Sequence, residues 1–130
     1  MNVFTFKPRF EASALAGVKL HTLRGHRKDG KPRAQVGERI SLRVWTGRPY
    51  ASKQREFAQA TVEMLRTVEV SESDIVLDGC VLLSPLCCDI LAMRDGFADW
   101  REMRGFFRAE CGLPFCGVMV VWKDLEPSKA

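Results

Sequence analysis

The sequence predicts a small α+β fold, a β-barrel of five to six short strands covered by two to three helices. Short runs of β-forming residues recur along the whole chain, whereas helix-forming stretches are few and short. The length of 130 residues, 46% of them hydrophobic, suits one ordinary domain over residues 1–130. That length excludes two full enzyme domains, a (β/α)8 barrel and a doubly wound dinucleotide-binding fold of usual size.

The first third of the chain predicts three strands and one short helix. Val3–Phe6 alternates β-forming residues, and Pro8 ends that strand. Glu11–Ala16 favours a short helix, because the glycine that follows is a suitable C-terminal cap. Lys19–Arg24 is a candidate strand. In Arg39–Thr46 apolar residues alternate with arginine and serine, which indicates a half-buried strand with a basic outer face.

The middle of the chain predicts further strands and a second helix. Ala58–Val70 contains β-branched residues among charges and is predicted to be mostly strand. Asp74–Ser84 fits two short strands joined by a turn at Asp78-Gly79. Pro85 can start a helix that runs to about Met93.

The last third predicts one more helix and a covered strand. Ala98–Glu110 has an apolar stripe at helical spacing, formed by Trp100, Met103, Phe106 and Phe107. We interpret this stripe as core packing rather than as a platform on which bases stack. Phe115–Lys123 is almost entirely apolar and predicts a central strand that is covered on both faces. The polar residues 124–130 are expected to form a frayed tail.

Charge is distributed unevenly along the chain. Residues 1–55 contain 13 Lys or Arg and 3 Asp or Glu, a net charge of +10, and residues 56–130 carry a net charge of −6. This asymmetry predicts either a cationic face that attracts phosphate-bearing partners or a surface on which the two signs are merely separated. A loop over residues 25–35 and a second polar loop over residues 47–54 contribute much of the positive charge.

The cysteines give little sign of a disulfide framework or a metal site. The five cysteines stand at positions 80, 87, 88, 111 and 116, an odd number whose spacings match no familiar zinc pattern. We therefore expect no metal, no cofactor and free thiols that act as small hydrophobic side chains. No apolar run approaches the roughly 20 residues of a membrane-spanning helix, and residues 1–10 lack a secretory pattern. We expect a soluble, cytoplasmic protein without a membrane partner.

The chemistry-bearing residues of the first third are Lys19, Thr22 and Arg24. A lysine whose pKa is lowered can act as a base toward a hydroxyl, and arginine offers a planar fork to a phosphate or a carbonyl. On a regular strand Lys19 and His21 share one face, whereas Thr22 and Arg24 share the other. A direct relay from lysine through threonine to histidine is therefore not expected, and His21 is expected at the surface.

These residues belong to an ordered series of motifs. Gly17-x-Lys19-x-x-Thr22-x-Arg24 is followed by Val36-Gly37-Glu38, by Asp95-Gly96-Phe97 before a helix, and by Gly117-Val-Met-Val-Val-Trp122 in the last strand. The succession, over roughly residues 3–123, resembles the ASCH domain family, relatives of the PUA domains that bind RNA. It is most similar to small phage and prophage ASCH proteins.

The resemblance implies a PUA-like β-barrel with a cleft beside the first helix and the second strand, where RNA or a nucleotide binds. One branch of the family hydrolyses the acetyl group from N4-acetylcytidine with a lysine, a threonine and a glutamate, and another member is a ribonuclease. Lys19 and Thr22 correspond to that lysine and threonine, and Arg24 to the arginine that ends the motif. The carboxylate falls nearest Asp95, which is one methylene shorter. Leu20 replaces a threonine common in that branch.

A second candidate region lies in the polar loop of residues 47–54. Arg48, Tyr50 and Lys53 combine positive charge with one aromatic ring, as single-strand binders do, although ordinary solvent loops have the same composition. Three functions follow. The first is a module that binds RNA or a nucleotide; the second is a metal-independent hydrolase that uses the same cleft, as a ribonuclease or an N4-acetylcytidine amidohydrolase. The third is a phage protein that binds a protein partner.

Overall fold

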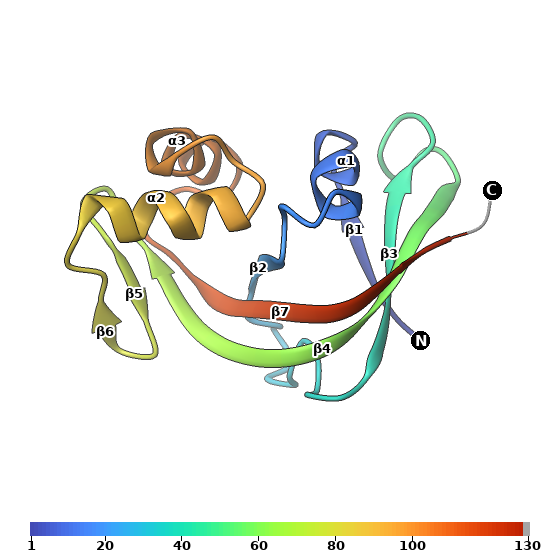
Figure 1. The fold of residues 1–130 in the computed structure, drawn as a ribbon, viewed down its shortest axis with the longest axis horizontal. Coiled ribbons are helices and arrows are strands. Elements are labelled where there is room, and N and C mark those ends of the chain that lie inside the picture. Colours follow the sequence, from blue (N-terminus) through green and yellow to red (C-terminus); the bar gives the residue numbers. More distant parts are fainter. Residues whose placement is uncertain (129–130) are drawn as a thin grey trace.

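Two long antiparallel strands form the centre of the sheet in this computed structural model, which describes residues 1–128. Strand β4 (Gln54–Val70) pairs with β7 (Phe115–Pro127) from Ala58 opposite Pro127 to Val70 opposite Phe115. The register shifts twice along this pair, and such bulges bend strands. Both strands accordingly curve together, and the helices lie on their concave side (Figure 1).

The remaining strands extend this pair into a mixed, curled seven-stranded sheet. β1 (Asn2–Phe6) runs parallel to β3 (Arg39–Trp45), and β3 is antiparallel to β4. β2 (His21–Gly25) pairs with β7. β5 (Ile75–Leu77) pairs with the far end of β4, and the sheet ends at β6, Cys80–Val81. The predicted small α+β barrel is confirmed, with seven strands where five to six were predicted.

The structure contains three helices within the described residues. They are α1 (Arg9–Leu15), α2 (Pro85–Arg94) and α3 (Trp100–Glu110). The side chain of Ser84 caps the N-terminus of α2, and that of Asp99 caps α3. The hairpin predicted between β5 and β6 is confirmed. None of these helices has both the length and the apolar character needed to cross a membrane.

Alternation along the strands directs apolar side chains into one core. Ile40, Leu42 and Val44 of β3 are buried, as is Ser41, whereas Arg39 and Arg43 are half-buried. On α3, Met103 and Phe107 are buried, and Trp100 and Phe106 pack against the same core while half-buried. The aromatic stripe of the last helix is therefore core packing, as the spacing predicts.

The C-terminal segment from residue 124 differs from the expected frayed tail. The segment predicted to fray from residue 124 continues β7 as far as Pro127, and the Ser128 amide donates to the Phe57 carbonyl at 2.9 Å. Its composition is polar, but pairing with β4 satisfies its backbone groups, so the expectation is wrong for residues 124–127. Residues 129–130, which the same expectation included, lie outside the described residues.

Candidate functional site

The motif of the first third leads directly into β2. Gly17, with φ +75°, ends α1, and the Lys19 amide donates to the Ser13 carbonyl at 2.9 Å. Further along, Gly25 of β2 lies opposite Gly117 of β7. A Cβ at Gly117 would lie 2.1 Å from the carbonyl oxygen of Arg24, so only glycine permits this close approach. The motif is thereby fixed against the central strand.

The carboxylate of the site comes from the end of α2. Asp95 is the C-terminal cap of that helix, and its backbone amide donates to carbonyls of the last turn. Gly96, with φ +99°, turns the chain there, and a Cβ on it would lie 2.9 Å from the Phe10 ring. The amide of Leu20 donates to the Arg94 carbonyl at 2.7 Å. These contacts hold the end of α2 against the segment that precedes β2.

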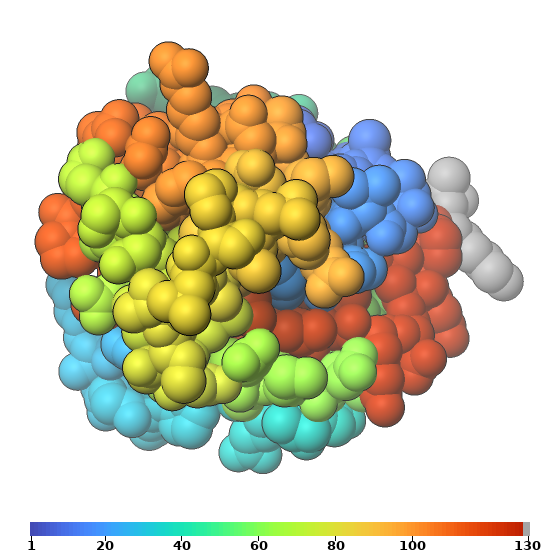
Figure 2. Space-filling model, turned by 60° about the vertical axis from the view of Figure 1, so that its left-hand side comes forward, coloured from blue at the N-terminus to red at the C-terminus, as the bar shows by residue number. Residues whose placement is uncertain are grey.

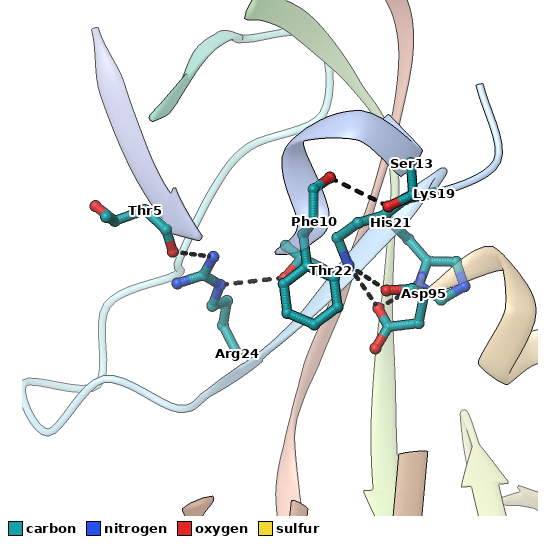
Figure 3. A network of polar contacts seen from close by, with 8 residues as sticks. All are labelled: Thr5, Phe10, Ser13, Lys19, His21, Thr22, Arg24 and Asp95. Carbon is teal, nitrogen blue, oxygen red and sulfur yellow. Dashed lines mark hydrogen bonds and ion pairs between the residues drawn. The ribbon is translucent and has the colours of Figure 1, made fainter. Parts of the chain in front are cut away.

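Lys19 and Asp95 meet in the interior. The Lys19 ammonium donates to the carbonyl oxygen of Asp95 at 2.5 Å and to its Oδ1 at 3.3 Å (Figure 3). It also lies 4.7 Å from the centre of the Phe10 ring. Lys19 is 2% exposed and Asp95 3%. Burial lowers the pKa of Lys19, and the charge of Asp95 partly opposes that shift.

His21 is buried rather than at the surface. Its Nδ1 lies 3.0 Å from Asp95 Oδ1, so Lys19 and His21 contact the same carboxylate. The alternation correctly places these two residues on one face. The expectation of a surface position is wrong because the C-terminal end of α2 covers that face and supplies a hydrogen-bond acceptor for the ring.

Thr22 and Arg24 form the other part of the polar cluster. Arg24 Nε donates to Thr22 Oγ1 at 3.3 Å, and its Nη2 donates to the Thr5 carbonyl at 2.8 Å (Figure 3). The guanidinium carbon lies 4.9 Å from the centre of the Phe6 ring. Burial lowers the pKa of Arg24 to about 10, with Asp95 opposing the shift, so the group remains charged at neutral pH. Among residues 1–128, Arg24 forms no direct ion pair with Asp95.

These four side chains line one cavity of about 270 Å³. Lys19, Thr22, Arg24 and Asp95 supply its polar part. Six phenylalanine rings supply most of the rest of its wall: Phe6, Phe10, Phe97, Phe106, Phe107 and Phe115. We call this space the β2 cavity. The structure thus brings together the lysine, threonine, arginine and aspartate that the sequence singled out.

The polar loop of residues 47–54 adjoins this wall without its predicted ligand-binding residues being part of it. Arg48, Tyr50 and Lys53 do not line the β2 cavity. Gln54 Nε2 donates to Thr5 Oγ1 at 3.4 Å, and Thr5 lines the cavity. Tyr50 is 91% exposed, and its ring centre lies 5.1 Å from that of Trp45. The ligand-binding role of Arg48, Tyr50 and Lys53 stays a prediction.

Sequence reasoning missed the aromatic wall of the β2 cavity, because it interpreted Phe106 and Phe107 only as core packing, whereas both also line the cavity. Phe97 could have been identified from the sequence, because it directly follows Asp95-Gly96 in the motif series. Phe10 carried no such signal, since its position in the wall depends on how α1 packs against α3: its ring centre lies 5.8 Å from that of Phe106.

A further cavity, of about 330 Å³, lies between α2 and the strands β4 and β7 (Figure 2). Its wall is mainly apolar and includes Leu82, Ile90 and Met119, with His21 at one side. Within residues 1–128 no group of three or more His, Cys, Asp or Glu side chains is arranged to hold a metal ion. The β2 cavity and this further cavity both have mainly apolar walls with few polar groups.

Comparison with known proteins identifies the fold. The crystal structure of the ASCH protein from Zymomonas mobilis matches with a TM-score of 0.56 and 16% identity, covering 96% of this chain and 68% of that one. A tyrosine-to-phenylalanine variant of that protein matches with a TM-score of 0.55 and 16% identity over 98% of this chain and 71% of that one. A serine-to-alanine variant of the same protein matches with a TM-score of 0.55 and 17% identity, covering 96% of this chain and 68% of that one. No family model and no curated protein matches the sequence. At this level of identity the likeness establishes architecture: the chain has the ASCH-domain fold.

Proposed function

We propose that the β2 cavity binds RNA or a nucleotide by enclosing one base or nucleoside. The observation that carries this proposal is the composition of the cavity wall, where Lys19 and Arg24 lie beside aromatic rings in a space of about 270 Å³. Ligand pockets span roughly 300–1,000 Å³. A cavity slightly below that range suits a single base, not a stack of several.

The wall chemistry matches the two properties of a base. A flat aromatic ring stacks on phenyl rings, and each such contact contributes about 1–3 kcal/mol to binding. The polar edge of the base requires donors and acceptors, which Lys19, Thr22 and Asp95 supply at one end of the cavity. Because the base must leave its helix to enter, the RNA that binds here is single-stranded.

The arrangement of Lys19 favours binding over catalysis. Its ammonium is already engaged by the carbonyl and the carboxylate of Asp95. Within the described residues no hydrogen bond joins Lys19 to Thr22, whose hydroxyl instead accepts from Arg24. A base that takes the proton of a hydroxyl must lie within hydrogen-bond reach of it. Lys19 is therefore positioned to bind a ligand or to stabilise the fold, and not to act as a base toward Thr22.

A second candidate is an amidohydrolase that acts on N4-acetylcytidine. It is favoured by the presence of the Thr22 hydroxyl in the same cavity as a lysine whose pKa burial has lowered. Thr22 Oγ1 would attack the amide carbonyl carbon, the neutral form of Lys19 would take its proton, and Arg24 would stabilise the developing oxyanion. The C–N bond would then break as Lys19 returns the proton to the leaving N4 amine of cytidine. A water activated by Asp95 would release acetate from Thr22. A ribonuclease would use Lys19 and Arg24 to stabilise the crowded phosphorane while the ribose 2′-hydroxyl attacks.

One experiment separates these functions. The purified protein is incubated with a chelator and with labelled single-stranded RNA, cytidine or N4-acetylcytidine, and bound ligand and products are measured separately. We expect binding without products, weakened in Phe10→Ala because a ring of the wall is lost. Products that disappear in Thr22→Val, which removes the hydroxyl but keeps the side-chain shape, would establish the hydrolase instead.

The matched control for this experiment is Arg101→Ala. Arg101 is an exposed residue of α3 that does not line the β2 cavity, and its loss removes one positive charge. If the control and Phe10→Ala bind RNA and nucleosides as well as the unaltered protein, the base does not occupy the β2 cavity and the proposed function is wrong.

A further inference from the structure

A second polar cavity begins where β2 ends. It has a volume of about 300 Å³ and is lined on one side by the loop of residues 26–34 and on the other by β4 and the turn at Asp78. In Figure 2 this loop, in light blue, lies beneath the hairpin of β5 and β6, in yellow. We call this space the loop cavity. Its basic wall residues are His26, Arg27, Lys31, Arg33 and Arg66.

Acidic groups balance only part of this charge. Asp29 pairs with Arg27 at 2.7 Å, and Asp78 pairs with Arg66 at 2.8 Å. Within residues 1–128 no carboxylate forms an ion pair with the other lysines and arginines of the segment 24–33, which are Arg24, Lys28, Lys31 and Arg33. The end of β2 and the loop after it therefore carry uncompensated positive charge.

Arg33 stands at the boundary between the loop cavity and the β2 cavity. Its Nε donates to the Gly25 carbonyl at 2.6 Å, and Gly25 lines the β2 cavity while Arg33 lines the loop cavity. Burial is the main reason that the pKa of Arg24 is lowered, and the charge of Arg33 adds to that shift. Two half-buried guanidinium groups thus repel one another across the end of β2. An anion between them would remove that repulsion, and a phosphate matches their fork geometry.

We propose that the loop cavity holds the phosphate backbone of a single-stranded polynucleotide whose base occupies the β2 cavity. One phosphate lies between Arg24 and Arg33, and the next lies along the loop beside Lys31. This inference rests on the proposed function and extends it, because it names a strand with several phosphates as the ligand. A free nucleoside would use only the β2 cavity, and a mononucleotide would add only the phosphate at Arg33.

The experiment compares four probes by equilibrium titration at several salt concentrations: a nucleoside, its 5′-monophosphate, inorganic phosphate, and a single-stranded RNA of ten nucleotides. The variants are Arg33→Ala, Arg33→Lys and Lys31→Ala, with Arg101→Ala as the charge-matched control. Lys31 is exposed, and within residues 1–128 its side chain forms no hydrogen bond or ion pair, so Lys31→Ala should keep the fold; the bond to Asp29 comes from the Lys31 backbone amide. Melting temperatures check Arg33→Ala, because that change also removes the bond to Gly25.

We expect the RNA to bind more tightly than the monophosphate, and the monophosphate more tightly than the nucleoside. Arg33→Ala should weaken RNA binding about tenfold or more, with Arg33→Lys intermediate because lysine keeps the charge and loses the fork. Arg33→Ala and Lys31→Ala should each reduce the magnitude of the negative slope of log affinity against log salt by about 0.7. This is the change expected for one lost phosphate contact on a single strand. Lys31→Ala should leave nucleoside binding unchanged.

Three results would overturn the inference while leaving the proposed function intact. The first is equal affinity for nucleoside, monophosphate and RNA. The second is RNA binding that Arg33→Ala and Lys31→Ala weaken no more than Arg101→Ala does. The third is tight binding of the monophosphate or of inorganic phosphate at Arg33 with no gain from the longer strand, which would limit the site to one phosphate and contradict the backbone path. Failure of every probe to bind would refute the proposed function together with this extension.

Discussion

The Lys19 ammonium donates to both the carbonyl oxygen and the carboxylate of Asp95, at 2.5 and 3.3 Å, across 76 residues of sequence. This contact ties the segment that precedes β2 to the C-terminal end of α2. His21 Nδ1 lies 3.0 Å from the same carboxylate, so one aspartate contacts two side chains that are two positions apart and lie on the same face. The pair therefore positions the polar end of the β2 cavity as well as forming part of its wall.

Lys19→Met should destabilise the fold because it leaves the buried Asp95 carboxylate without its cation. Removing one partner of a buried pair costs about 3–5 kcal/mol. Urea unfolding measures the loss, with Lys53→Met as the control, since Lys53 is exposed and outside the cavity. A Lys19→Met protein as stable as this control would show that the ion pair does not hold α2 against β2.

Gly117→Ala should destabilise the protein by more than about 1–3 kcal/mol, the usual cost of overpacking, because the new methyl group would collide with backbone. An added Cβ there lies 2.1 Å from the Arg24 carbonyl oxygen. Gly105→Ala is the matched control: Gly105 lies within α3, and a Cβ on it would meet no atom within 4 Å. The control should be stabilised by about 0.5–1 kcal/mol, since alanine favours helix. Equal thermal denaturation midpoints for the two variants would contradict the close approach of β2 and β7.

Glu56 should contribute a pH-dependent part of the stability. The hydroxyl of Ser41 donates to its carboxylate at 2.5 Å, that of Ser128 donates at 2.8 Å, and these bonds hold the pKa of Glu56 below its usual 4.5. Because the folded-state pKa is the lower one, the stabilisation is fully present above pH 4.5 and is lost as the pH falls through the folded-state value.

The difference in unfolding free energy between the unaltered protein and Glu56→Gln measures this contribution. The difference should be larger at pH 7 than at pH 3, because at pH 3 the carboxyl of the unfolded chain is protonated and the stabilisation is reduced. A difference that stays constant between these two pH values would exclude the linkage.

Trp100→Glu distinguishes a structural role for α3 from a docking role. Trp100 is half-buried, packs against the core, and lies under the Arg104 guanidinium at 5.4 Å. A buried charge in its place should lower the melting temperature, because an unpaired carboxylate is costly away from water. An unchanged melting temperature would instead favour the reading in which this helix meets a protein partner.

The strands and their order along the chain were predictable because hydrophobic alternation is local. Ile40, Leu42 and Val44 follow it, and the Asp78-Gly79 turn was identified from two residues, both of which adopt positive φ. The tail was missed because polar composition does not reveal whether a backbone has a pairing partner. Residues 124–127 find that partner in β4.

The candidate site was predictable only in part. The motif in the sequence supplied Lys19, Thr22 and Arg24, and the resemblance added Asp95. Alternation assigned His21 to a face, but it could not tell that the end of α2 covers that face. The place of Arg33 at the boundary of two cavities depends on the path of a loop, which residue composition does not specify.

The most direct test of the central claim is a titration of the isotope-labelled protein with single-stranded RNA, followed by the backbone amide resonances. If a base occupies the β2 cavity, the largest shifts should fall on residues 19–25 and 95–97, with further shifts in the loop of residues 26–34. Shifts confined to the loop of residues 47–54 or to α2 and the β5–β6 hairpin, with residues 19–25 unchanged, would contradict the account.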